Sequence, residues 1–316
     1  MNASHNNIDS ISSRNILVTG SHRSGTTWVG KTLAASGGID YVHEPLNLLN
    51  ARDYNSPVSK WYEYIGKDEK RKEQFTAYLK SVIDGGSSTC IDRIKRSKVK
   101  KTPSIIYSEL RKFIRRNKPK VVKDPLALYS AEFFHNSLDY DVIITIRHPA
   151  AFAESLKNIN WTHDFNHFLS QDELMKEVMP DYQEEIERFV RSKKKREDIL
   201  EQAILLWNLT HARILYYMQN YENWIFVKNE ALSLNPHKEY EKIFKYYQLP
   251  FNDQVKSFID KTTGGSETAG EKRDSRRNVT KWTRKLSGKE IDQIHLKTAK
   301  IAKYFYDESE WFSTTR

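Results

Sequence analysis

A short apolar run that ends in glycine is the feature that most constrains how this 316-residue chain can fold. Residues Asn15–Gly20 (NILVTG) are typical of a buried strand that feeds a turn. Residues 26–36 then follow a helical pattern that stops at Gly37-Gly38, and residues 41–43 predict a second strand. A strand, a loop, a helix and a strand within about 30 residues form a βαβ unit, so we expect a parallel sheet.

Three further runs predict the remaining strands of this sheet. They are rich in β-branched or aromatic residues and lie at Lys120–Lys123 (KVVK), 141–146 (DVIITI) and 224–227 (WIFV). Helical patterns are expected to begin near Leu126 and Pro149 and to cover about 171–220 and about 288–304. The chain therefore predicts a P-loop-like α/β fold of three layers, with a central parallel sheet flanked by helices.

We expect one elaborated domain over residues 15–316. Residues 1–14 are polar and lack the apolar segment of a secretory signal, so they predict a disordered leader. The charged stretch at about 53–118 predicts a helical insertion that covers the substrate side. Residues at about 262–284 are polar, basic and contain glycine, which predicts a mobile loop.

The net charge of +10 and the pI of about 9.3 are compatible with an anionic partner, and equally with a soluble surface that simply has an excess of lysine. That partner is a multiply anionic cofactor, an acidic polysaccharide, a membrane surface or a nucleic acid. A basic run at 93–101 (RIKRSKVKK) either steers an acidic acceptor or forms a solvated face. Helix-turn-helix, zinc and aromatic-stacking motifs are missing from the sequence, so we expect no nucleic-acid partner. A non-enzymatic polyanion-binding protein is one alternative function.

Cys90 is the only cysteine, which excludes an intramolecular disulfide and a cysteine-based zinc site. The sequence contains no other cluster of metal-ligand residues, and we expect no metal. No stretch approaches the roughly 20 apolar residues that a membrane helix needs. These observations predict a cytoplasmic protein without a transmembrane segment, and they leave its oligomeric state open.

Residues 20–27 (GSHRSGTT) have the composition of a loop that holds phosphate. Gly20 makes the turn after the strand, and Gly25 lets the backbone approach an anion. Thr26 and Thr27 offer hydroxyl and N–H groups at the positive end of the following helix.

A literal Walker A match at residues 25–32 (GTTWVGKT) competes with this frame and predicts a kinase or NTPase that uses ATP and magnesium. It begins five residues after the predicted strand ends, and it places Trp28 and Val29 inside a loop whose amides should face phosphate. Lys31 would open a helix of little more than one turn. The frame that begins at Gly20 is therefore favoured.

A second anion site is predicted where the strand at 141–146 ends. Arg147 follows this strand, and Ser155 lies about 9 Å along a helix that begins at Pro149. Side chains at the carboxyl ends of parallel strands point into the crevice where such sheets bind ligands. An arginine and a serine together suit a single phosphate group.

The order of these motifs resembles the sulfotransferase superfamily: GSHRSGTT after a strand, then HEP, VVKDP, and IRHP with a serine downstream. The resemblance implies that the chain binds 3′-phosphoadenosine 5′-phosphosulfate (PAPS) and transfers its sulfuryl group to a hydroxyl acceptor. It implies that the first loop holds the 5′-phosphosulfate and that the later Arg and Ser hold the 3′-phosphate. The residues so implied are Arg23, Ser24, Gly25, Thr26 and Thr27 for the former, and Arg147 and Ser155 for the latter. Trp28 is a further candidate for contact with the cofactor.

The same resemblance suggests the groups that carry the chemistry. Glu44, in the HEP segment, is the expected base, because carbohydrate and tyrosine sulfotransferases place a glutamate there, and partial burial is expected to raise its pKa. Arg23 and Lys123 are expected to stabilise charge on the leaving 5′-phosphate. His43 and Asp124 are the alternative bases. The competing explanation for Glu44 is an ion pair with Arg23 that only shapes the loop.

Segments nearer the C-terminus look like bacterial relatives placed near polysaccharide assembly: LWN at 206–208, VKNE at 227–230 and RRNVTKWTRKL at 276–286. A saccharide is therefore the implied acceptor, as a polysaccharide, an oligosaccharide or a glycolipid. In the family a basic C-terminal loop folds over the nucleotide, which makes Arg276, Arg277 and Trp282 candidates. The chain departs from many cytosolic members at two places, since Arg23 stands where they carry lysine and Lys123 is not part of a K-x-H segment.

Overall fold

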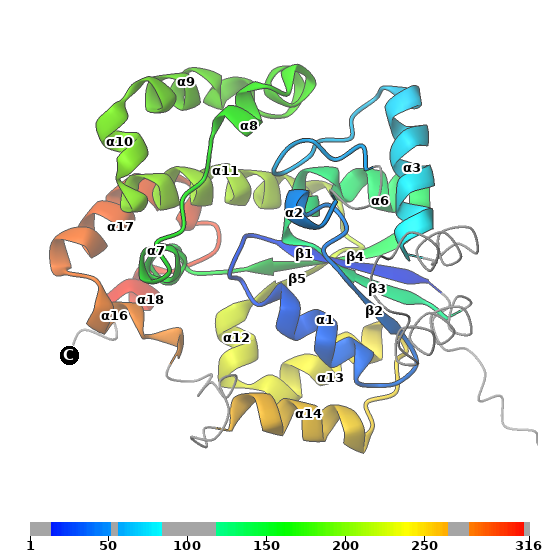
Figure 1. Ribbon diagram of the computed structural model, residues 1–316. Coiled ribbons are helices and arrows are strands. Elements are labelled where there is room, and N and C mark those ends of the chain that lie inside the picture. Colours follow the sequence, from blue (N-terminus) through cyan, green and yellow to red (C-terminus); the bar gives the residue numbers. More distant parts are fainter. Residues whose placement is uncertain (1–13, 52–55, 84–117, 265–277, 313–316) are drawn as a thin grey trace, which may run out of the picture.

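The computed structural model describes residues 14–51, 56–83, 118–264 and 278–312 (Figure 1). Its centre is a five-stranded sheet in the order β2-β3-β1-β4-β5, in which every neighbouring pair is parallel. The strands are β1 (Asn15–Gly20), β2 (Asp40–His43), β3 (Lys120–Lys123), β4 (Tyr140–Ile146) and β5 (Ile225–Lys228). The predicted α/β fold with a central parallel sheet is confirmed, and each predicted strand is present within one residue at either end.

The middle strand, β1, is covered on both faces. Leu17 pairs with Val122 of β3 on one side and with Val142 of β4 on the other. Its side chain joins the core on one face, whereas those of Ile16 and Val18 join the core on the other. This alternation follows from strand geometry, and it explains why the strand reads as a continuous apolar run.

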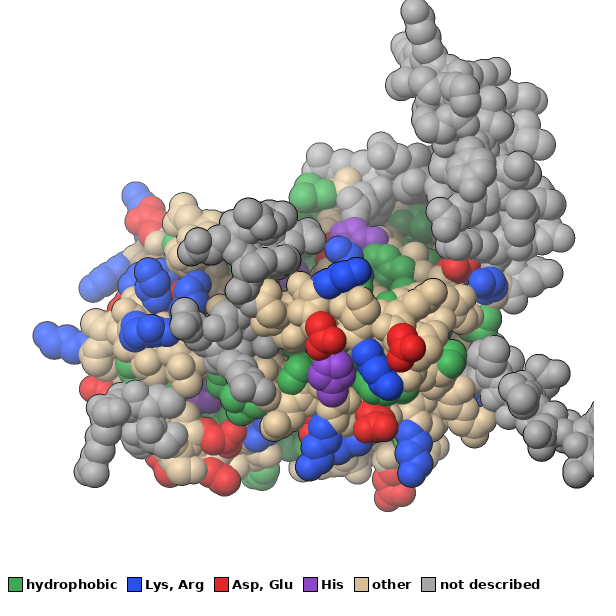
Figure 2. All heavy atoms as spheres, turned by 90° about the horizontal axis from the view of Figure 1, so that it is seen from below, with side chains coloured by type: hydrophobic (Ala, Val, Ile, Leu, Met, Phe, Trp, Pro, Cys, Tyr) green, Lys and Arg blue, Asp and Glu red, His purple; other side chains and the backbone are tan. Residues whose placement is uncertain are grey.

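One face of the sheet carries α1 (Thr26–Ala34), α12 (Asn229–Leu234), α13 (Pro236–Tyr246) and α14 (Asp253–Thr263) (Figure 1). Val29 of α1 and Phe244 of α13 are fully buried in this layer. The outer surface of the layer carries acidic and basic side chains next to one another (Figure 2). Lys242 and Glu239 form one such pair at 2.7 Å.

The opposite face is covered by η1 (Pro125–Ser130), α6 (Ala131–Leu138), α7 (Pro149–Asn158), α11 (Ile199–Asn220) and α17 (Gly288–Ala302). The longest of these, α11, starts where the Asp198 side chain accepts the backbone N–H of Leu200 at 2.8 Å. Trp207 and Tyr217 are then fully buried along it. The remaining segments are α2 (Leu48–Ala51), α3 (Glu69–Ile83), α8 (Asn166–Leu169), η2 (Leu174–Val178), η3 (Pro180–Tyr182), α9 (Gln183–Arg191), α10 (Lys193–Glu197), α16 (Trp282–Lys285) and α18 (Glu308–Phe312).

The helical stretch predicted over about 171–220 consists of several short elements followed by α11. Pro180 is the first residue of η3, and the side chains of Ser192 and Asp198 cap α10 and α11. Proline, serine and aspartate all favour helix starts, so they divide a stretch whose apolar pattern is continuous.

The predicted insertion and C-terminal loop are only partly described. The insertion at about 53–118 contains α3, whereas its basic run at 93–101 lies outside the described residues. Both ends of the loop predicted at about 262–284 are helical, because Thr262 and Thr263 close α14 and Trp282–Lys285 forms α16. Arg276 and Arg277 lie outside the described residues. Within the described ranges, no helix combines the length and the apolar character needed to cross a membrane.

Candidate active site

Residues 20–27, the loop that the sequence predicts to hold phosphate (called the phosphate loop below), connect the middle of the sheet to α1. β1 ends at Gly20, and α1 begins at Thr26 with Gly25 as its N-cap. Gly25 adopts a φ of 94°, and a Cβ atom at this position would come within 2.4 Å of Asn229 Nδ2. The left-handed backbone favours glycine, and a Cβ would also displace the end of the Asn229 side chain.

These boundaries support the frame that begins at Gly20 and contradict the Walker A frame. Trp28 and Val29 lie inside α1, where the Val29 N–H donates to the Gly25 carbonyl at 3.1 Å. Lys31 lies in the last turn of α1, at the opposite end of the helix from the loop. Its side chain is therefore not placed to contact an anion at the helix start.

Neighbouring strands hold the loop in shape. The Ser24 Oγ bonds to the Thr145 Oγ1 at 2.5 Å, and the Asn229 side-chain amide donates to the Ser24 carbonyl at 3.0 Å. Thr145 belongs to β4, and Asn229 follows β5 directly. The loop is thus fixed from the two strands on one side of β1 before any ligand binds.

The N-terminus of α1 has neither a side-chain cap nor an acidic neighbour in the described part of the chain. The first N–H groups of this helix therefore lack intrahelical partners and carry the positive end of the helix dipole. Thr27 is exposed there, whereas the Thr26 side chain is buried.

Arg23, Arg147 and Ser155 meet at the head of the loop. The Arg23 Nε donates to the Ser155 Oγ at 3.0 Å, and an Arg147 guanidinium nitrogen donates to the Arg23 carbonyl. Arg23 itself has a φ of 62°, a left-handed conformation that is uncommon for a non-glycine residue. The structure therefore brings together three of the residues that the sequence singled out.

Buried contacts orient Arg147 and its strand end. The Trp207 indole N–H donates to the Arg147 carbonyl at 2.9 Å, and the His148 N–H donates to the Glu230 carboxylate at 3.0 Å. Burial lowers the pKa of Arg147, and the nearby charge of Glu230 opposes that shift. Among the described residues, Arg147 Nε and Ser21 Oγ are buried without a hydrogen-bond partner.

Lys123 and Glu44 form an ion pair at the carboxyl edge of β3 and β2. The Lys123 ammonium donates to Glu44 Oε1, and the Asn47 side chain donates to Glu44 Oε2 at 2.6 Å. The Glu44 N–H also donates to the Lys123 carbonyl at 2.8 Å. Glu44 has a φ of 44°, so the backbone of this member of the pair is strained.

This contact corrects the predicted pKa of Glu44. Burial by itself raises the pKa of a carboxyl group. Here the hydrogen bonds from Lys123 and Asn47, together with the charge of Lys123, outweigh burial and hold the pKa of Glu44 below its ordinary value. The prediction of a raised pKa is therefore wrong. The ion pair that Glu44 forms is with Lys123, where the sequence suggested Arg23.

The two alternative bases occupy different surroundings. Asp124 is fully buried, and its two oxygens accept the N–H groups of Leu46 at 2.6 Å and Leu126 at 2.9 Å. Burial, with the charge of Glu44, raises the pKa of Asp124 to about 7. His43 is exposed and lies 4.0 Å from Glu44 Oε1. Asp124 therefore holds the backbone beside Glu44, whereas His43 faces solvent.

A family model described as "Sulfotransferase domain" matches residues 13–308. The chain belongs to the sulfotransferase family. No curated protein matches the chain.

Several solved sulfotransferase structures are similar to this sulfotransferase at low identity. One is the sulfotransferase domain from the Synechococcus PCC 7002 olefin synthase, with 14% identity and a TM-score of 0.47 over 93% of this chain and 96% of that one. Mycobacterium avium sulfotransferase STF9 has 13% identity and a TM-score of 0.44 over 95% and 79%. Mouse sulfotransferase SULT7A1 complexed with PAP has 13% identity and a TM-score of 0.40 over 94% and 87%.

Two tryptophans that were expected to contact the nucleotide differ in exposure. In the sulfotransferase, Trp28 is partly buried, and its indole N–H donates to the Thr262 hydroxyl at 3.0 Å. Trp282 is 3% exposed and stacks on His148, with ring centroids 5.0 Å apart. Trp282 therefore packs on the residue that follows Arg147, and its contact with a nucleotide stays a prediction.

Sequence reasoning missed the residues that anchor the site. Thr145 and Asn47 were not singled out, and Asn229 was noted only as part of the VKNE segment. Asn229 carries a usable signal, because it directly follows a strand whose carboxyl end lies at the same sheet edge as the loop. Thr145 lies inside an apolar strand and gives no such signal.

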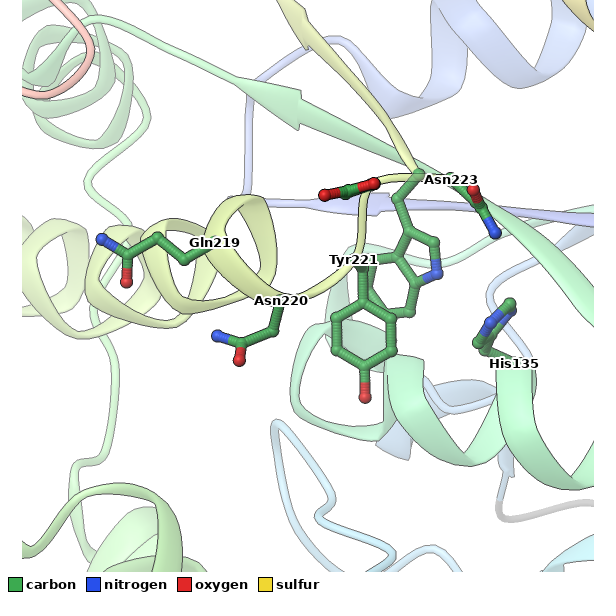
Figure 3. A pocket seen from close by; sticks show the side chains of 7 residues that line it. His135, Gln219, Asn220, Tyr221 and Asn223 are labelled. Atoms are coloured by element: carbon green, nitrogen blue, oxygen red, sulfur yellow. The ribbon is translucent and has the colours of Figure 1, made fainter.

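A cavity of about 320 Å³ lies elsewhere in the sulfotransferase, lined by His135 and residues 219–224 (Figure 3). These residues precede β4 and β5, so the cavity opens at the amino edge of the sheet. A second cavity of about 460 Å³ is lined by residues that include Tyr64 and Arg213. Neither cavity is lined by a residue of the phosphate loop.

Proposed function

We propose that this sulfotransferase moves the sulfuryl group of PAPS to a hydroxyl group of a saccharide. The convergence of Arg147 and Ser155 on Arg23, at the head of the phosphate loop, carries the proposal. Two arginines and a serine beside a free helix N-terminus suit a ligand with two separate anionic groups. PAPS has such groups on its 5′ and 3′ oxygens, whereas the phosphates of ATP form one chain.

The residues present fit such a donor. Gly25 leaves room where a Cβ would contact Asn229, and the helix start beyond it is uncapped within the described residues. The buried Arg147 Nε and Ser21 Oγ lack partners in the described part of the chain, although buried polar atoms are normally paired. These features support an anion at the loop and a second one near Arg147.

We assign the two anion sites accordingly. The 5′-phosphosulfate is held by the loop, with Ser24, Gly25, Thr26 and Thr27 supplying N–H and hydroxyl groups and Arg23 supplying charge. The 3′-phosphate is held by Arg147 and Ser155. Contacts of Trp28, Arg276, Arg277 and Trp282 with the rest of the nucleotide belong to the same proposal.

Transfer needs in-line geometry, a base and charge stabilisation. The acceptor oxygen forms a bond to sulfur while the bond from sulfur to the 5′-phosphate oxygen breaks, and Glu44 takes the acceptor proton. Arg23, the loop amides and Lys123 stabilise the charge that develops on the leaving oxygen. As Lys123 interacts with that charge it interacts less with Glu44, so the carboxylate becomes a stronger base when it is needed.

The choice of a saccharide as acceptor is supported by the glutamate in the HEP segment and by the C-terminal segments that resemble bacterial relatives. A kinase that uses the Walker A frame is not favoured, because Lys31 lies at the far end of α1.

Calorimetry with adenosine 3′,5′-bisphosphate, compared with ADP plus magnesium, tests the donor. We expect clear preference for the bisphosphate. Arg147→Ala should weaken its binding by about 10- to 100-fold, because a hydrogen bond to a charged group contributes about 1.5–3 kcal/mol. Binding of adenosine 5′-monophosphate, which lacks the 3′-phosphate, should change little.

Lys31→Ala is the matched control, because this exposed lysine matters only in the Walker A frame. Its binding of either nucleotide should equal that of the wild type. Preference for ADP with magnesium, or loss of binding in Lys31→Ala, would rule out the proposed donor.

A further inference from the structure

A row of aromatic rings borders the phosphate loop at His22. The Trp161 ring lies 5.1 Å from the His22 ring, tilted by 33°, and 5.9 Å from the His163 ring, at 28°. Tyr62 stands edge-on to His22 at 5.3 Å and to His163 at 5.6 Å. The rings come from three segments: the loop after β1, the stretch before α3, and the stretch between α7 and α8 that rises past the sheet in Figure 1.

These rings differ in the surface they leave free. Tyr62 is fully buried and His163 is 8% exposed, whereas His22 and Trp161 are both partly exposed. The Trp161 indole N–H makes no hydrogen bond within the described residues. Trp161 therefore leaves part of its side chain and a hydrogen-bond donor accessible beside the loop.

His22 is held in one orientation next to the reactive groups. Its Nδ1 shares a hydrogen bond of 2.5 Å with the Tyr62 hydroxyl, which leaves Nε2 for another partner. Burial lowers the pKa of His22 to about 4, so the ring is neutral at pH 7. The charges of Glu44, Lys123 and Arg23 all act on this ring. The aromatic row thus lies in the same site as the proposed base.

We propose that Trp161 and His22 form a stacking platform for a sugar ring of the acceptor. The inference rests on the proposed function, because the platform serves the hydroxyl group that Glu44 deprotonates. One face of a pyranose consists of C–H groups, which pack on an aromatic face whose π density is negative. The hydroxyl groups at the ring edge pair with donors and acceptors such as the Trp161 N–H and His22 Nε2.

The groups around the platform favour a polyol over an apolar ring. Glu44 and Arg23 lie close enough for their charges to act on His22, and both need polar partners when water leaves. A phenol or a steroid covers these groups without replacing their lost hydration, which costs free energy. A saccharide supplies a hydroxyl group at several positions at once, so Trp161 selects ring shape while the polar groups select hydroxyl groups.

Saturation-transfer NMR on the full chain tests the platform. The donor site is filled beforehand with excess adenosine 3′,5′-bisphosphate. The panel contains cellotriose, chitotriose and maltotriose as saccharides, and 4-nitrophenol and 2-naphthol as phenols. We expect at least one saccharide to receive magnetisation on its ring C–H protons. Trp161→Ala should lower the affinity for that saccharide by about tenfold and Trp161→Phe by about twofold, since an aromatic contact contributes about 0.5–1.5 kcal/mol.

Controls separate the platform from folding and from the donor site. Trp224→Phe, at the other edge of the sheet, should leave saccharide binding unchanged, and all three variants should bind the bisphosphate as the wild type does. Failure of the wild type to bind the bisphosphate contradicts the proposed function itself. If the bisphosphate binds but no saccharide does, if only phenols bind, or if Trp161→Ala binds saccharide normally, the platform is overturned and the donor assignment stands.

Discussion

At the carboxyl edge of the sheet, backbone strain and charge occur together. Arg23 and Glu44 hold left-handed backbone, and Glu44 is paired with the buried Lys123. At the amino edge, Tyr221 and Trp224 line the cavity of about 320 Å³ shown in Figure 3, where their rings stack 4.2 Å apart. The amino edge contains the cavity. Left-handed backbone occurs there too, at Asp139 (φ 56°), but that residue closes helix α6, an ordinary place for it. At the carboxyl edge it coincides with the Glu44–Lys123 ion pair.

The comparison suggests that strained, charged backbone is a better guide to a reactive site in this fold than a cavity is. A hollow between aromatic rings follows from how large side chains pack. Strained backbone that carries ionised groups persists only where the surrounding structure enforces it, and such strain gathers at functional sites. We therefore expect changes at the amino edge to affect stability, and changes at the carboxyl edge to affect the reaction.

The largest effect on stability is expected at the amino edge. Trp224 is 5% exposed and packs against Tyr217, Tyr221 and His135. Trp224→Ala should lower the free energy of unfolding by about 3–5 kcal/mol, the range for a buried tryptophan, as measured by chemical denaturation. The kcat of the folded fraction should stay as in the wild type. A large loss of kcat in the folded fraction would show that this edge takes part in the reaction.

The largest effect on the reaction is expected from Lys123→Met. Loss of one preorganised charge at the leaving oxygen should lower kcat by about 10²–10³-fold, measured in single-turnover sulfuryl transfer from PAPS. The variant should also lose stability, because Glu44 is left without its ionic partner.

The double variant Lys123→Met/Glu44→Gln separates these two losses. Removal of both charges should restore much of the stability and none of the rate. Full activity in either variant contradicts the role given to Lys123.

A smaller effect is expected from Gly25→Ala. The left-handed backbone costs a non-glycine residue about 1–2 kcal/mol, so affinity for adenosine 3′,5′-bisphosphate should fall by about tenfold. Gly288→Ala is the matched control, because a Cβ at Gly288 meets nothing within 4 Å. The double variant Gly25→Ala/Asn229→Ala removes the close contact with Asn229 and leaves the backbone strain. Unchanged affinity in Gly25→Ala would mean that the loop does not bind the anion.

A further expected effect is a change of stability with pH. Asp124 has an unfolded pKa of 3.8 and a folded pKa of about 7, so the folded state binds more protons between these values. Its contribution to stability therefore falls as the pH rises from about 4 to about 7, by at most about 1.4 kcal/mol per pH unit. The difference in unfolding free energy between wild type and Asp124→Asn should shift against the wild type over this range. Denaturation at three pH values measures it, and a shift in the opposite direction refutes the assignment.

Local sequence was enough to predict the position of the loop and of the two arginines, Arg23 and Arg147. The strand Asn15–Gly20, the glycines of the loop and the helix start at Thr26 are contiguous, so chain order alone sets their frame. Arg147 follows an unambiguous strand, and parallel strands bring their carboxyl ends to one edge. These rules placed the residues proposed to bind anions without knowledge of any contact.

The partners of Glu44 and Ser24 could not be obtained in this way. Lys123 is 79 residues from Glu44, and Asn229 is 205 residues from Ser24. The sheet order β2-β3-β1-β4-β5 makes them neighbours, and strand order is not written in any local pattern. The direction of the Glu44 pKa shift depends on that order, because burial and the Lys123 contact act in opposite directions.

The sequence by itself determined that a phosphate loop joins a buried strand to a helix and that an arginine and a serine follow a later strand. Both facts rest on residues close together along the chain, where backbone geometry and hydrophobic periodicity act directly. Only the tertiary structure decided that Glu44 is held by Lys123 and that Trp161 lies beside His22. Such pairs depend on which strands and loops become neighbours, and the packing of the whole core selects that arrangement.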